Sequence, residues 1–127
     1  MRFPAAPRAL VLGLLTAIFV SVATPVAASY ADDEDFYYQS TMFSWNELMR
    51  QLDVVKNAET LQGQCVQMRK AKVSMHDTWH SFGQLMDVPG VINGPNSGTY
   101  NQMSEIFDQA DKKINTFLKE NCTPPAQ

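Results

Sequence analysis

Residues 61–86 read LQGQCVQMRKAKVSMHDTWHSFGQLM, and this segment determines the fold that we expect. Its apolar side chains recur at alternating intervals of four and three residues. That period places them on one face of an α-helix, whereas a β-strand alternates at every second residue. The face consists of Leu61, Cys65, Met68, Lys72, Met75, Trp79, Phe82 and Met86, with Lys72 as its polar member. The segment therefore predicts a long amphipathic helix.

Two flanking segments carry the same helical pattern, residues 33–57 and residues 99–121. In the first segment the apolar face consists of Trp45, Leu48, Leu52 and Val55. In the second it consists of Tyr100, Met103, Phe107, Ala110, Ile114 and Phe117. We therefore expect a helix in each, and Ser97 or Thr99 is the expected N-cap of the last one. Between the second and third helices, residues 87–98 predict a loop, because Pro and Gly recur there.

The first helix has two candidate starting points. The acidic residues 32–35 would interact favourably with the positive end of the helix macrodipole. Ser44 and Glu47 have the spacing of a capping box, which would start a helix later. We expect the early start, and a break near Ser44 would instead divide the segment and give four helices.

The chain has two cysteines, Cys65 and Cys122, and their positions test how the helices are arranged. Measured along the second and third helices, each cysteine lies roughly 32 to 35 Å from the loop that joins them. Antiparallel packing of these helices therefore brings the cysteines together. We expect one disulfide and an all-α fold, a small antiparallel bundle of three helices, or four if the first segment breaks.

The N-terminal residues have the order of a secretory signal peptide. Arg2 and Arg8 precede an apolar run at residues 9–20, and small residues follow it up to Ala28. We expect cleavage after Ala28, which leaves a single helical domain at residues 29–127. Cleavage removes two arginines and no acid, so the formal net charge of −3 becomes −5. The expected location is periplasmic or secreted, where a disulfide persists.

Charge and motif content exclude several classes of function. Asp and Glu number 13 against 10 Lys and Arg, which leaves no basic surface to follow a nucleic-acid backbone. No segment after the leader has the length and apolarity of a membrane span. With the cysteines paired, and without a G-x-S-x-G or H-E-x-x-H motif, we expect no enzymatic activity.

One pair of residues suggests metal chemistry. His76 and His80 are four residues apart, which places both imidazoles on one helix face in a spacing that suits Zn²⁺ or Cu²⁺. Glu105 is the candidate third ligand, because it has the same height in the predicted hairpin as His80. Haem is a less favoured cofactor, since no C-x-x-C-H motif is present. These residues suggest a metal or haem carrier or sensor as an alternative function.

The aromatic residues of the first helix suggest protein binding instead. Several lie beside its main apolar face, and the contact residues that we expect are Tyr37, Tyr38, Phe43 and Trp45. The alternatives are that these side chains cover the edge of the bundle or face a second copy in a homodimer. The expected function is therefore a small exported helical protein, without a cofactor, that binds another protein as an inhibitor, immunity, accessory or effector protein.

Overall fold

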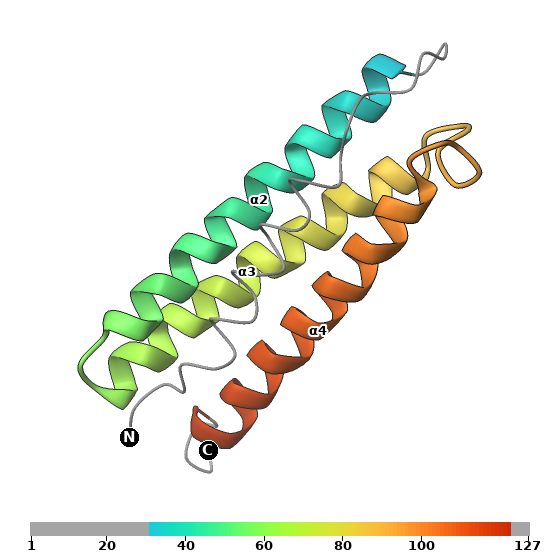
Figure 1. Cartoon of the computed structure of the whole chain (residues 1–127). Helices are drawn as coiled ribbons and strands as arrows, with labels where there is room; N and C mark the ends of the chain where they lie inside the picture. The colour runs from blue at the N-terminus through green and yellow to red at the C-terminus, as the bar shows by residue number, and fades with distance from the viewer. Residues whose placement is uncertain (1–30, 123–127) are drawn as a thin grey trace.

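The computed structural model describes residues 31–122, which form three long helices. They are α2 (Ala31–Asn57), α3 (Leu61–Met86) and α4 (Ser97–Asn121). Each runs antiparallel to the helix before it (Figure 1). The all-α, three-helix prediction is therefore confirmed. Because α2 continues through Ser44, the four-helix alternative is wrong. The predicted signal peptide and its cleavage after Ala28 lie outside the described residues.

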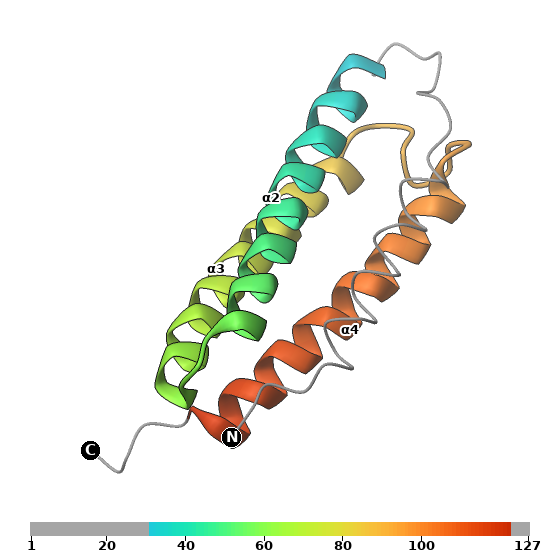
Figure 2. The ribbon, with the colours of Figure 1, turned by 60° about the vertical axis from the view of Figure 1, so that its left-hand side comes forward.

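Helices α2 and α3 form a tight pair that lies side by side in both views (Figures 1 and 2). The connection between them is short because Thr60 caps α3, its hydroxyl oxygen accepting a hydrogen bond from the Gly63 amide at 3.0 Å. The buried side chains of α3 include the short residues Ala71, Ser74 and Thr78, which let a neighbouring backbone approach closely. The Thr78 hydroxyl donates to the Ser74 carbonyl at 2.8 Å, so its burial leaves no unpaired donor.

The loop between α3 and α4 closes one end of the core. Val88 and Val91 are buried there, 6% and 3% exposed. Gly90 has a φ of 87°, in the left-handed region that glycine adopts without a steric penalty. Gly94 packs so tightly that a Cβ atom would lie 2.5 Å from the Gly90 carbonyl oxygen. The N-cap of α4 is Asn96, rather than the expected Ser97 or Thr99.

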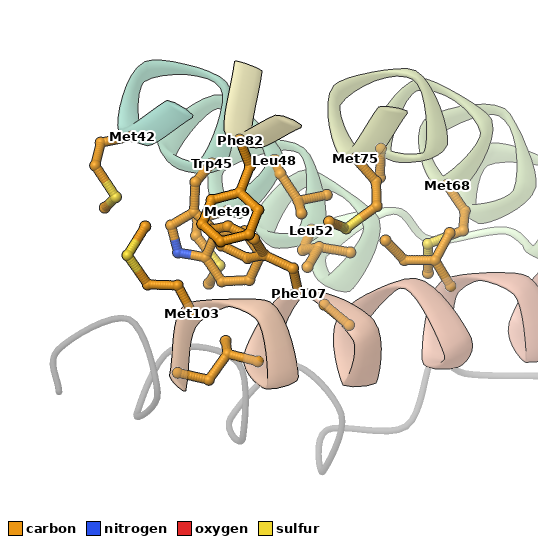
Figure 3. Packing of buried hydrophobic residues seen from close by; sticks show 14 of the residues in the cluster. Met42, Trp45, Leu48, Met49, Leu52, Met68, Met75, Phe82, Met103 and Phe107 are labelled. Atoms are coloured by element: carbon orange, nitrogen blue, oxygen red, sulfur yellow. The ribbon is translucent and has the colours of Figure 1, made fainter. Parts of the chain in front are cut away.

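Phe107 of α4 is the centre of the aromatic core. Its ring centroid lies 4.8 Å from that of Trp45 and 5.3 Å from that of Phe82. Trp79 adds an edge-to-face contact at 5.8 Å. Figure 3 shows the rings of Trp45, Phe82 and Phe107 and the leucine and methionine side chains around them. Phe107 therefore connects α4 to both other helices. The buried methionines are Met42, Met49, Met68, Met75 and Met103.

At the opposite end from the loop, α3 and α4 are joined by the predicted disulfide. Cys65 and Cys122 are bonded, with Cα atoms 5.5 Å apart, which confirms the prediction. Arg69 donates to the Cys122 carbonyl oxygen at 2.9 Å. Lys72, the polar member of the apolar face, pairs with Asp111 of α4 at 3.1 Å. Helix α4 is thus attached to α3 by the loop, the disulfide and an ion pair between them.

Replacing both cysteines by serine should lower the free energy of unfolding by about 4 kcal/mol, because the unfolded chain is then no longer closed into a loop across a separation of 57 residues. Urea denaturation followed by circular dichroism measures this difference. A loss below about 1 kcal/mol would mean that loop closure contributes little to the stability of the fold.

Candidate interaction surface

Two aromatic side chains point away from the bundle on α2. Phe36 is 64% exposed and Phe43 is 77% exposed. They are seven residues apart, so they lie on one side of the helix, about 10.5 Å from each other along its axis. We call the surface around them the α2 outer face. It consists of Phe36, Gln39, Ser40, Phe43, Asn46, Glu47 and Arg50.

A buried carboxylate fixes the first turns of this helix. Glu34 is 5% exposed, and its Oε2 atom accepts hydrogen bonds from the Tyr100 hydroxyl at 2.7 Å and from the Asn96 side chain at 3.0 Å. Both donors lie at the start of α4. This contact holds the buried side of α2 toward α4, so the opposite side, with Phe36, faces outward.

Burial of the Tyr100 ring raises the pKa of its phenol well above the ordinary value near 10. Its hydrogen bond to the Glu34 carboxylate adds to this effect, because the bond requires the proton. Burial, together with the charge of Asp35, also raises the pKa of Tyr38. The Tyr100 hydroxyl therefore stays a donor to Glu34 over the whole physiological pH range.

The four predicted contact residues do not share one environment. Phe43 is exposed, whereas Tyr37 and Tyr38 are half-buried and pack against the core. Trp45 is 0% exposed and contacts Phe107, so the expectation that it contacts a partner is wrong for this fold. Trp45 belongs to the apolar face that packs into the core, so its ring cannot also contact a partner on the opposite side of the helix.

Phe36 is one of the aromatic residues beside the main apolar face of the first helix, but it was not among the four expected contact residues. The signal that identifies it is its spacing of seven residues from Phe43, which gives the two rings the same direction on a helix. The Phe36 ring also forms an edge contact with Tyr37, with ring centroids 5.2 Å apart. Because Tyr37 packs against the core, this contact restricts the movement of the exposed Phe36 ring.

Charge is divided along the bundle. Every Lys and Arg of the described residues lies in the half that ends at the disulfide, at positions 50, 56, 69, 70, 72, 112, 113 and 119. The half that ends at the α3–α4 loop carries acidic residues, including Asp32, Asp33 and Asp35, which are exposed beside Phe36. The α2 outer face therefore has an acidic end near Phe36 and a cation, Arg50, at its other end.

The predicted metal ligands do not form a metal centre in residues 31–122. His76 and His80 are exposed on α3, and Glu105 is exposed on α4. No group of three or more His, Cys, Asp or Glu side chains in this part of the chain is placed to hold a metal ion. Equal height in the hairpin does not bring Glu105 to the histidines, because height does not fix the direction in which a side chain points around its helix.

The chain matches no protein-family model, and no curated protein or solved structure matches it significantly. Within residues 31–122, no helix combines the length and the apolar character needed to cross a membrane.

The raised pKa of Tyr100 predicts a loss of stability in alkaline solution. The folded state holds the phenol proton more tightly than the unfolded chain does, so the free energy of unfolding should fall as the pH rises above about 10. Titration of Tyr100 can change the free energy of unfolding by at most about 1.4 kcal/mol per pH unit. Urea denaturation between pH 8 and 11 should show a shallower fall in the Tyr100→Phe variant. An identical fall in both proteins would contradict the assignment.

Substitutions on the buried and exposed sides of α2 should differ in their effect on the free energy of unfolding. Trp45→Ala should cost about 3–5 kcal/mol of unfolding free energy, because it removes a large side chain from the core. Phe43→Ala should change it by less than about 0.5 kcal/mol, because the ring is exposed. Urea denaturation at low protein concentration measures both. A large cost for Phe43→Ala would place that ring in the packing of the monomer.

Proposed function

We propose that the protein is an exported, non-enzymatic helical protein that acts by binding another protein through the α2 outer face. The observation that carries this proposal is the exposure of Phe36 and Phe43, 64% and 77%, on a helix whose opposite side is tightly packed. Transfer of a Phe side chain from water into an interface stabilises by about 1.5–3 kcal/mol. Aromatic anchors of this kind dominate many protein interfaces.

The charges near Phe36 favour a protein over a membrane or a nucleic acid as the binding partner. Asp32, Asp33 and Asp35 are exposed there, and anionic lipids or phosphates would be repelled by them. Between Phe36 and Phe43 the outer face carries the uncharged residues Gln39 and Ser40. A protein surface can cover these side chains without burying an unpaired charge.

Export is part of the same proposal. The signal-peptide pattern of residues 1–28 directs the chain to a compartment in which the Cys65–Cys122 bond persists. A small disulfide-bonded bundle with a fixed contact helix suits an inhibitor, an immunity protein, an accessory subunit or a secreted effector, since each of these acts by contact. The proposal does not include metal transport, because no group of three or more His, Cys, Asp or Glu side chains in residues 31–122 is placed to hold a metal ion.

A photoreactive phenylalanine analogue at position 43 tests the proposal in the compartment that the signal peptide reaches. Irradiation should give one discrete covalent adduct, because the ring at this position would be covered by the partner. The matched control has the analogue at Gln109, which is exposed on α4. Adding Phe36→Ala to the position-43 chain should reduce the adduct at least tenfold, since it removes the second anchor.

Circular dichroism should give the same helix content for all these chains, so that loss of the adduct reports on the surface. No adduct from position 43, or an equal adduct from position 109, would exclude the α2 outer face as a binding surface.

A further inference from the structure

We infer that the protein bound to the α2 outer face is a second copy of this chain, packed antiparallel on the same face across a two-fold axis at Phe43. This inference rests on the proposed function and names the partner of the same surface. It begins from the spacing of the side chains on this face, which places complementary residues at equal distances on either side of Phe43.

The spacing of the large side chains gives the register. Phe36, Phe43 and Arg50 follow one another at intervals of seven residues, and all three are exposed. In an antiparallel pair centred on Phe43, the two Phe43 rings meet at the axis. Each Phe36 ring then lies opposite Arg50 of the second copy, where a guanidinium can stack on an aromatic face.

The polar positions agree with the same register. Ser40 and Glu47 lie on one side of the line through Phe36, Phe43 and Arg50, and Gln39 and Asn46 lie on the other. The two-fold axis therefore brings Ser40 next to Glu47 of the second copy and Gln39 next to its Asn46, so hydrogen-bonding groups meet hydrogen-bonding groups. A parallel pair would instead set Arg50 against Arg50. Like charges directly opposite each other destabilise such a contact. The antiparallel arrangement is therefore the one that the side chains favour.

Charge complementarity extends beyond the rings. Exposed Asp32 and Asp33 lie one turn before Phe36, within reach of the long Arg50 side chain of the second copy. In the single chain Arg50 pairs with Glu47, and both groups are on the surface. A surface ion pair of this kind is weak, so Arg50 can contact the second copy as well. The acidic end of each face thus meets the cation of the other.

A two-fold contact also closes on itself. Each copy uses the same surface, so the assembly stops at a dimer, which is the commonest symmetric arrangement of soluble proteins. Exposed valines on α3, Val66 and Val73, form a second apolar pair, but they lie beside Arg69 and Lys70. A contact from the α2 outer face to these valines would leave both surfaces open for further copies.

One helix face buries a small area, so the dimer is expected to dissociate on dilution. Sedimentation velocity of the purified mature protein over about 1–500 µM should show a shift from monomer to dimer. Phe43→Glu should weaken the dimer at least tenfold, because it sets two carboxylates together at the axis. Arg50→Glu should weaken it less, and Asp32→Arg added to Arg50→Glu should restore part of the loss.

Cysteine cross-linking tests the register without removing either phenylalanine. Both native cysteines are in the disulfide, so an introduced thiol reacts alone. Chains with Ser40→Cys, mixed with isotope-labelled chains with Glu47→Cys, should form a disulfide between unlike chains at least ten times faster than between like chains. The matched control is a mixture of Gln109→Cys and Thr116→Cys chains, whose exposed positions on α4 are also seven residues apart.

The outcomes separate this inference from the proposed function. Wild-type protein that stays monomeric at 500 µM, cross-linking no faster than in the α4 control, or cross-linking from position 40 to a cysteine at Val66 each overturns the antiparallel dimer. If one of these results accompanies a photoadduct at position 43 to a different protein, the proposed function stands and the self-association fails. A photoadduct with the mass of two copies supports both, and no photoadduct removes the proposed function itself.

Discussion

Helix α4 is attached to α3 at both of its ends, by the loop at residues 87–96 and by the bond between Cys65 and Cys122. This double attachment is the constraint on which the rest of the bundle depends. Figure 2 shows α4 set apart from the tight α2–α3 pair. Phe107 fills the space between them with contacts to Trp45 and Phe82. Because α4 is held at both ends, its central side chains can pack at a fixed height against two helices.

The same arrangement fixes how α2 meets solvent. Its buried side is attached to α4 through Glu34, which accepts hydrogen bonds from Asn96 and Tyr100. A buried carboxylate needs such donors. Once these contacts set the rotation of α2, the directions of Phe36 and Phe43 follow from the 3.6-residue period of the helix. The outward position of the two rings is thus a consequence of the polar contact at the start of the helix.

The spacing of the apolar residues and the positions of the two cysteines made much of this fold predictable. The alternating four-three spacing of residues 61–86 identified a helix, and the equal heights of Cys65 and Cys122 identified the antiparallel hairpin. Rotation about each helix axis was harder to predict. Glu105 has the right height to approach the histidines but is exposed on α4. Trp45 belonged to the inward face, and its aromatic character alone could not indicate a surface role. Neither the Glu34 contact nor the exposure of Phe36 followed from composition, because both depend on how α2 turns against α4.

The separation of charge along the bundle has a consequence for how the molecule behaves in an electric field. A rod whose Lys and Arg side chains lie in one half, and whose other half carries an excess of carboxylates, has a permanent dipole moment along its axis. Near an anionic surface such a particle turns its disulfide end toward the surface and its acidic end, with Phe36, toward the bulk solution. In the antiparallel pair that we infer, the two dipoles oppose each other and largely cancel. A charged surface would therefore orient the single chain but not the dimer.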